Sequence, residues 1–321
     1  MKKSGKIAMI AASGMVFAGI VISLCAMCAM GFDFSKMETA TFRTETHPVE
    51  QSFSRICVEG AGSDVRLYLS DDDSCRVQCH EPEGLESIIE IKDDTLYIRQ
   101  QDNRTWKQYI GIFVEHDEIG IYLPESSYQS ITASLHSGDL MVPEEFRFQE
   151  ADIQSTSGRI ELHASVEGDL FLRSDSGNIT LADSGLHGLT ARSNSGKITM
   201  EHVTARADIR LETSSGNLRI SDVQGQNLSA EVNSGSMDFQ NVLAETDMQL
   251  KSTSGSIRLQ RSEGYTMHIQ TGSGNVSGTL CTEKQFVTNT GSSSCSVPDS
   301  GSGGICEITT GSGDVHLELN K

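Results

Sequence analysis

The chain is poor in residue types that many folds and functions need. It has one tryptophan and five prolines, and aromatic residues make up 6% of its 321 positions. Basic side chains are also scarce, since 25 Lys and Arg stand against 44 Asp and Glu, for a net charge of −19. Nucleic acid is therefore not an expected partner, because binding phosphates requires a basic surface. The composition indicates a β-rich, acidic body with one apolar segment.

Motifs for catalysis and for metal binding are missing too. The nine histidines are scattered singly, with no two at metal-binding spacing on a helix. Glycine-rich pieces such as TGSGNV lack the Lys-Ser/Thr of a phosphate loop and precede expected strands rather than a helix. Calcium-binding repeats would show a nine-residue period, which is absent. We predict no catalytic residue, no cofactor and no metal.

One short phrase is abundant. Over residues 135–321, a Ser-Gly pair followed two positions later by an aliphatic residue or cysteine recurs ten times, at intervals of 19 or 20 residues. All nine intervals fall in this range, and a period of this kind is typical of a solenoid. Ser293 replaces the glycine once, and the other nine pairs contain Gly138, Gly158, Gly177, Gly196, Gly216, Gly235, Gly255, Gly274 and Gly313.

Apolar residues fall in fixed columns around each glycine. Positions two and four after it are apolar, as at Ile160 and Leu162, and so are positions seven and five before it, as at Leu170 and Leu172. A spacing of two marks strands with one buried face. We predict an all-β fold, a single-stranded, β-helix-like solenoid of about ten coils of 19–20 residues. At about 4.8 Å per coil the nine steps give a rod on the order of 43 Å long.

The Ser-Gly pairs are predicted to be the corners of the coils. We expect the nine glycines there to adopt positive φ, which glycine tolerates without a Cβ penalty. The serine hydroxyl is expected to bond nearby backbone groups or the serine one coil along. The pair is therefore interpreted as structural, so that any site is expected on the variable positions between corners.

The N-terminal part divides into three short segments. Residues 1–6 carry three lysines, and residues 7–32 are uncharged and long enough to span a bilayer. Lysines before the span favour a cytoplasmic N-terminus, which predicts a single-pass cell-membrane protein with an extracytoplasmic C-terminal domain. A cleaved signal peptide is the alternative, although its apolar region is usually shorter. Residues 33–50 are rich in Thr and Glu and are interpreted as a tether.

Residues 51–134 are expected to form a β-rich N-terminal cap on the solenoid, which covers the open edge of the first coil. No separate cap is expected at the other end, because the chain stops four residues after Leu317. The strands predicted in the N-terminal cap are residues 55–59, 64–69, 75–80, 87–91, 95–98 and 118–123.

The chain has eight cysteines, in three different parts of the sequence. Two cysteines lie in the apolar segment, and three more, Cys281, Cys295 and Cys306, fall in core columns, where a buried thiol acts as a small hydrophobe. A disulfide is the alternative in an oxidising compartment. In the cap, Cys57 to Cys79 is the favoured bridge, on the expectation that their strands are neighbours.

Trp106 lies in the polar stretch of residues 102–109. An aromatic side chain in such a loop either closes a small core or stacks on a sugar or a protein partner. It is the candidate contact residue of the cap.

The stretch FSRICVEGAGSDVRLYL, together with the reiterated Ser-Gly-x-aliphatic phrase and the N-terminal apolar segment, resembles the bacterial putative adhesin family. That family includes LiaG-like cell-envelope proteins, and the resemblance covers residues 51–321. It implies a β-solenoid outside the cytoplasmic membrane, with no established catalytic residues. It carries no functional residue over to this chain.

Three functions are compatible with these features. The first is a non-enzymatic, membrane-anchored protein for surface binding or adhesion, or for envelope scaffolding and stress response, with a cell-wall component or envelope protein as partner. The second is a scaffold that self-assembles end to end through its C-terminal coil. The third is a polysaccharide-active β-helix enzyme, which would need clustered carboxylates on one face.

Overall fold

The computed structural model describes residues 3–29, 31–32, 41–106, 108, 115–291 and 293–320. An apolar helix, α1 (Lys3–Ala29), comes first, and all the strands follow it. Within α1, the window Ala12–Ala29 has a mean hydropathy of 2.1 and no buried residues, so it is long and apolar enough to cross a membrane. Membrane anchors and signal sequences share this property.

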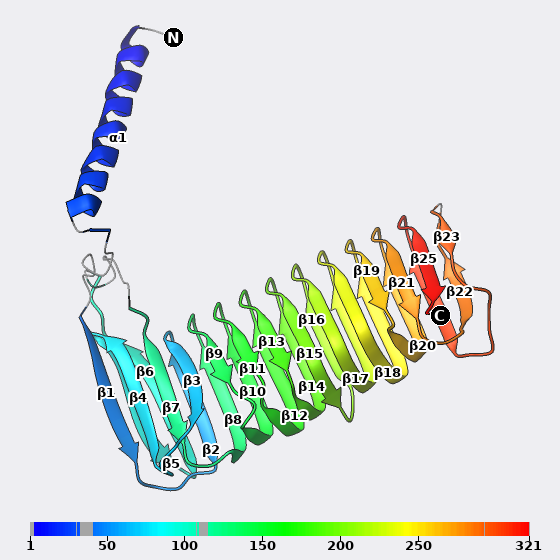
Figure 1. Cartoon of the computed structure of the whole chain (residues 1–321), viewed down its shortest axis with the longest axis horizontal. Helices are drawn as coiled ribbons and strands as arrows, with labels where there is room; N and C mark the ends of the chain where they lie inside the picture. The colour runs from blue at the N-terminus through cyan, green and yellow to red at the C-terminus, as the bar shows by residue number, and fades with distance from the viewer. Residues whose placement is uncertain are drawn as a thin grey trace.

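The strands stack into a rod with two long parallel ladders (Figure 1). A third, short parallel ladder includes Gly185 and Leu186, which pair with Thr204 and Ala205. The first ladder holds the strands that precede the Ser-Gly corners, and the second holds those that follow them. In spatial order the first ladder is β6 (Thr95–Asp102), β2 (Arg55–Ala61), β8 (Ser127–Leu135), β10 (Arg147–Ser155), β12 (Ser165–Ser174), β14 (Gly185–Ser193), β16 (Ile209–Thr213), the later parts of β17 (Leu218–Val232) and β18 (Met237–Ser252), β20 (Glu263–Thr271), β24 (Ile305–Thr310) and β22 (Gln285–Asn289).

The second ladder runs beside it along the whole rod. Its order is β7 (Glu118–Leu123), β3 (Asp64–Leu69), β9 (Leu140–Val142), β11 (Ile160–Leu162), β13 (Ile179–Ala182), β15 (Ile198–Ala205), the early parts of β17 and β18, β19 (Ile257–Gln260), β21 (Val276–Leu280), β25 (Val315–Leu319) and β23 (Cys295–Ser296).

The core lies between the two ladders. Residues of one column face each other in register from layer to layer, as in Ile160 on Ile179 and Ile179 on Ile198, and all three are fully buried. Leu170 and Leu172 of the first ladder are buried as well. Each layer alone buries few side chains, so stacking supplies the burial and the interstrand hydrogen bonds that stabilise it. The predicted all-β solenoid and its apolar columns are confirmed.

At both ends of the rod, the outermost layer is not the first or the last coil in the sequence. At the C-terminal end, the last strands in sequence, β24 and β25, lie between β20–β21 and the earlier pair β22–β23. Figure 1 shows the red strand β25 inside the orange β23. At the N-terminal end, β2 and β3 likewise lie between β8–β9 and the later pair β6–β7. The expectation that the last coil ends the rod uncapped is wrong, because the preceding coil covers it.

Antiparallel strands close the N-terminal end. The strand β4 (Cys75–Pro82) pairs with β7 on one side and with β1 (Phe42–Val49) on the other, and β5 (Leu85–Lys92) pairs with β6. All six strands predicted in the cap are present, with small differences at their ends. The predicted tether over 33–50 is wrong from Phe42 to Val49, because this segment adds an edge strand, where Pro48 is tolerated. Residues 33–40 lie outside the described residues.

Glycine is required at the corners because the layers stack closely there, and not because the backbone has a positive φ. None of the nine has a positive φ, so that expectation is wrong. A Cβ added at Gly196 would overlap the carbonyl oxygen of Gly177, well inside the 3.0 Å below which real Cβ contacts essentially do not occur. The same overlap recurs at each of the nine corners, and for Gly138 it is with the carbonyl oxygen of Ser63. The layers can therefore stack at this spacing only without a side chain there.

Positive φ occurs at a different corner, six residues after the glycine. Five consecutive layers have φ between 47° and 54° at this position. Asp, Asn and His tolerate this conformation better than most residues do, and they fill four of the five positions. The residues are Asp183, His202, Asp222, Asn241 and Arg261.

Candidate functional site

A hydroxyl group three residues before the glycine fastens the corner. Thr213 Oγ1 accepts a hydrogen bond from the backbone N–H of Gly216 at 3.0 Å, and Ser252 Oγ accepts one from Gly255 at 2.8 Å. These hydroxyl residues are buried, whereas the serine directly before each glycine is exposed. The hydroxyl that holds the corner is therefore not the one expected. The recurrence of Ser or Thr at this earlier position was the signal that could have identified it.

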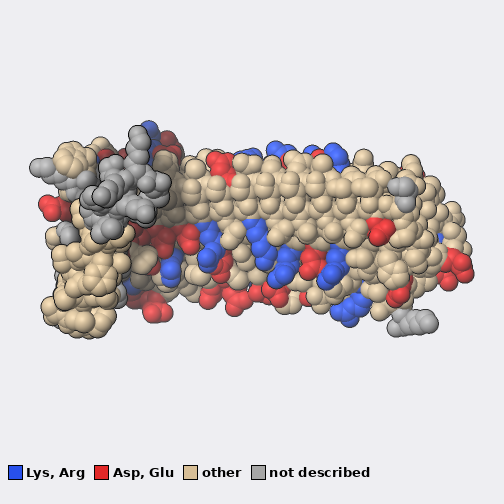
Figure 2. Space-filling view, turned by 90° about the horizontal axis from the view of Figure 1, so that it is seen from above, with Lys and Arg blue, Asp and Glu red and all other residues tan. Residues whose placement is uncertain are grey.

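The exposed serines form a ridge along the rod. Seen from above, an uncharged strip runs the length of the solenoid, and charged side chains gather beside it (Figure 2). This serine ridge is made by the residues directly before the corner glycines, namely Ser137, Ser157, Ser176, Ser195, Ser215, Ser234, Ser254, Ser273 and Ser312.

A groove of about 610 Å³ lies on the first-ladder side of this ridge. We call it the corner groove. It crosses the ends of six successive first-ladder strands, from β8 to β17, and takes equivalent positions from each. Its outward side chains, four and two residues before the corner glycines, include Gln154, Arg173, Arg192, Glu212 and Glu231, and then His136, Thr156, Asp175, Asn194, Ser214 and Asn233.

Ion pairs between layers organise the charges of the corner groove. Arg173 Nη1 lies 3.1 Å from Asp152 Oδ1, and Arg192 Nε lies 2.9 Å from Glu212 Oε2. Glu212 is shared, because its Oε1 also lies 2.6 Å from Arg210 Nε. Such half-exposed pairs contribute little stability. They do hold the long side chains of Arg173 and Arg192 in fixed positions along the groove.

Two hydroxyls in the corner groove lack a hydrogen-bond partner. Ser155 and Ser174 are each 6% exposed, and the Oγ atom of each is buried without a partner among the described residues. Their counterpart Ser193, one layer along, accepts the N–H of Gly196 at 2.8 Å. Buried polar groups are normally paired, so an unpaired one calls for an explanation. Both atoms are shielded from solvent beneath the groove, so a ligand in the open groove does not reach them.

The Toastrack DUF4097 family matches this chain over residues 53–187 and again over residues 180–321. Together these two matches cover the cap and the whole solenoid. The chain belongs to the Toastrack family. A search of curated proteins gives no match.

Several solved structures are similar to this chain. A putative adhesin from Parabacteroides merdae is 15% identical, with 88% of this chain and 98% of that chain covered, at a TM-score of 0.52. A putative adhesin from Parabacteroides distasonis is 16% identical, with coverages of 88% and 98% and a TM-score of 0.49. A putative lipid binding protein from the same species is 16% identical, with coverages of 86% and 97% and a TM-score of 0.48. At these identities the likeness to the first structure establishes the fold alone.

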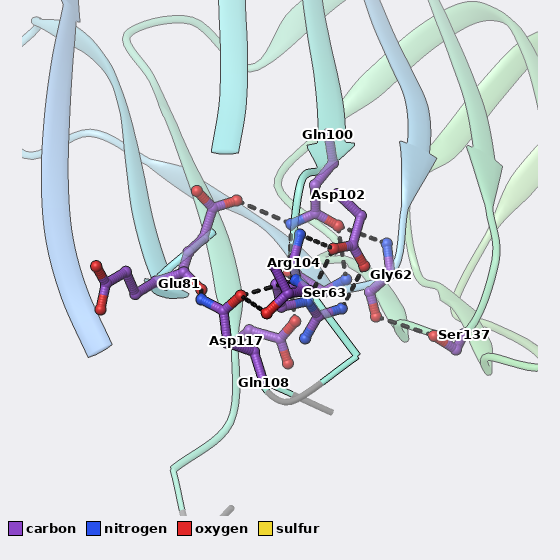
Figure 3. A network of polar contacts seen from close by, with 11 residues as sticks. Gly62, Ser63, Glu81, Gln100, Asp102, Arg104, Gln108, Asp117 and Ser137 are labelled. Atoms are coloured by element: carbon purple, nitrogen blue, oxygen red, sulfur yellow. Dashed lines mark hydrogen bonds and ion pairs between the residues drawn. The ribbon is translucent and has the colours of Figure 1, made fainter. Parts of the chain in front are cut away.

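A polar network joins the Toastrack cap to the first solenoid layer (Figure 3). Gln100 is its centre, since its Oε1 accepts the N–H groups of Gly62, at 2.6 Å, and of Ser63, at 3.2 Å. Its Nε2 donates to Glu81 Oε1 at 2.8 Å, and Ser63 Oγ donates to Asp117 Oδ2 at 2.7 Å. Ser63 is the residue on which Gly138 stacks. The network therefore fixes the layer from which the regular repeat starts.

The loop that carries Trp106 is tied to the same end. Gln108 Oε1 accepts the N–H of Thr105 at 2.7 Å, and Gln108 Nε2 donates to the carbonyl of Glu83 at 3.2 Å. The Trp106 side chain is 69% exposed. Of the two interpretations offered for this residue, closing a small core does not fit such exposure. Tyr109, at the end of the polar stretch, lies outside the described residues.

The expected cysteine pairing does not form. All eight cysteines are free, and Cys57 on β2 is not next to Cys79 on β4, because β2 pairs with β6 and β8 while β4 pairs with β1 and β7. Burial and the nearby carboxylate of Glu59 raise the pKa of Cys57 to about 11. Burial raises the pKa of Cys79 to about 12. Both thiols are therefore protonated and unreactive near neutral pH.

The three cysteines placed in core columns have different environments. Cys306 is buried in β24, and burial raises its pKa to about 12. Cys281 and Cys295 are exposed, so their assignment to the core is wrong. Cys295 belongs to the coil that covers the C-terminal end, where no further layer packs on the outer side, whereas Cys281 directly follows β21.

Proposed function

We propose that this Toastrack protein is a membrane-anchored, extracytoplasmic binding protein whose corner groove holds a polar polymer of the cell envelope. The observation that carries the proposal is the groove itself. It runs across successive layers at one spacing and presents polar side chains from the same two positions of each layer. A row of hydroxyl, amide, carboxylate and guanidinium groups suits an extended ligand with hydrogen-bonding groups at regular intervals, such as a cell-wall glycan.

Membrane anchoring is part of the proposal. It is supported by the apolar helix α1 and by the lysines that precede the apolar segment, which favour a cytoplasmic N-terminus. Mass spectrometry of the mature protein from membranes tests it. A chain that retains α1 supports the anchor, and one that begins near Ala29 contradicts it.

Binding without turnover is favoured by the state of the groove carboxylates. Glu212 is paired with two arginines, and Glu231 lies 2.7 Å from Lys251 Nζ. A glycosidase general acid instead needs a pKa raised by burial or by a like charge. Release of reducing sugar or unsaturated product from envelope glycans by the purified protein would contradict this part.

The groove is tested by sedimentation of the detergent-solubilised full chain with isolated cell-wall sacculi. We expect the double variant Arg173→Gln, Arg192→Gln to bind at least about tenfold more weakly, because two or more hydrogen bonds from charged donors are lost. The matched control is Arg219→Gln, Arg258→Gln, which removes two exposed arginines of the second ladder, outside the groove. Equal binding by all three proteins would reject the groove as the site.

A further inference from the structure

The C-terminal end layer has an unpaired edge. In the described part of the chain, each strand of the two ladders has a neighbour on both sides except β22, which pairs only with β24, and β23, which pairs only with β25. The N–H of Gln285 donates inward to the carbonyl of Gly304 at 2.9 Å. Since backbone groups alternate along a strand, the N–H groups of Phe286 and Thr288 point outward. They are ready to bond another strand.

The chemistry of this edge differs from that of the opposite end. Edge strands are usually protected from pairing by charges or proline. At the N-terminal end, β5 carries Glu86, Glu90 and Lys92, and β1 carries Arg43, Glu45 and Pro48, so both edges are protected. By contrast, residues 285–298 contain no charged residue and include Val287, which is 57% exposed.

The difference in charge between the two ends indicates that the C-terminal edge pairs with the same edge of a second copy. Two copies of a chain with a net charge of −19 repel one another over most of their surface, and the uncharged edge is where they can meet. A head-to-tail fibre would need a free edge at the N-terminal end, which β1, β4 and β5 close with charged, antiparallel strands. The same edge of a second copy has no such barrier. A two-fold axis normal to the ladders then places β22 antiparallel to its counterpart and closes the assembly at two chains.

We propose that two copies of this protein associate tail to tail through β22 and β23 into a closed, antiparallel dimer. Pairing continues both ladders across the two-fold axis. It also covers Phe286, which is half-buried at the end of the core. The dimer is independent of the corner groove, so it can fail while the proposed binding function stands.

Two variants of β22 test the dimer in the detergent-solubilised full chain. Thr288→Pro removes an outward N–H without removing an inward one, and Val287→Lys places like charges at the centre of the junction. The matched control is Ile88→Lys, which adds the same charge at an exposed aliphatic residue of β5, at the opposite end of the rod. Circular dichroism and the thermal midpoint verify that each variant is folded.

The measurement is the protein mass across a concentration series by light scattering and sedimentation. We expect two chains per particle for the wild type and for Ile88→Lys, and one chain for both β22 variants at a concentration where the wild type is fully dimeric. Three results would overturn the proposal: a wild type that stays monomeric at high concentration, a dimer that survives both β22 variants, or particles that keep growing with concentration.

Discussion

The middle layers of the rod and its C-terminal end layer repeat the same sequence phrase under different constraints. In the middle, each corner glycine lies directly on the carbonyl of the layer beneath, and a strand pairs on both sides. In the end layer Ser293 replaces the glycine, Gly291 adopts a φ of 57°, and Cys295 is exposed. The overlap is always with the layer on the N-terminal side, so glycine is required where the corner keeps this backbone path, and the end layer, which turns at Gly291, accommodates Ser293.

The largest expected effect is at a middle corner. Gly216→Ala would place a Cβ against the carbonyl oxygen of Gly196, which is backbone and cannot move aside without separating the layers. We expect a loss of stability above about 4 kcal/mol, or failure to fold. The matched change Ser293→Ala, in the end layer, should cost less than about 0.5 kcal/mol. Denaturant unfolding followed by circular dichroism measures both. Similar costs at the two corners would reject stacking as the reason for glycine.

Substitutions of core residues should show the same difference between the middle layers and the end layer, with smaller losses of stability. Leu211 is fully buried between layers, so Leu211→Ala should cost about 3 kcal/mol through lost burial and a residual cavity. Phe286 packs on the core from one side only, and Phe286→Ala should cost less than half as much, because part of its surface already faces water. The shift of the unfolding midpoint compares the two. A cost for Phe286→Ala equal to or above that for Leu211→Ala would mean that the end layer is as tightly packed as the middle.

The regular part of the fold could be predicted because each layer meets the same neighbours. The alternating pairs such as Leu170 and Leu172 have one buried face, and a fixed period repeats that face. The order of the end layers could not be predicted in this way. The β24–β25 coil fits equally well, by its apolar columns, next to β20–β21 or at the outside, and only packing in three dimensions distinguishes the two places.

The site was harder to predict than the fold. Arg173 and Arg192 belong to a column whose residues vary freely, so nothing in the sequence distinguishes them from other exposed arginines. Only the parallel, in-register ladders bring such residues from successive layers into one groove. The exposure of Cys295 was missed for a related reason, because its column is a core position only when another layer follows outside it.

The two ends can also be compared through the cap network. Gln100→Leu should leave the N–H groups of Gly62 and Ser63 without their acceptor, at a cost of about 2 kcal/mol, because buried donors lose their partner. Hydrogen exchange of these two amides should accelerate, while amides in β22 at the far end remain unchanged. Gln101→Leu is the control, since Gln101 is exposed and its side-chain Nε2 donates to Asn103 Oδ1, outside the network. Unchanged exchange at Gly62 and Ser63 would show that the cap is held by other contacts.

The smallest expected effect is the weakening, at low pH, of the hydrogen bonds that join Ser294 of the end layer to Asp314. Asp314 Oδ1 accepts the N–H of Ser294 at 3.0 Å and its hydroxyl at 2.7 Å, and these hydrogen bonds lower the pKa of Asp314. A lowered pKa in the folded state means that the stabilisation is complete above the ordinary aspartate value of about 3.9 and is lost as the pH falls through the folded-state pKa. Amide protection of residues 294–297 should therefore decrease slightly in acid. Asp314→Asn should remove this pH dependence, whereas Asp299→Asn should retain it. If both variants behave like the wild type, Asp314 does not fasten the end layer, and pairing with β25 alone holds β23 in place.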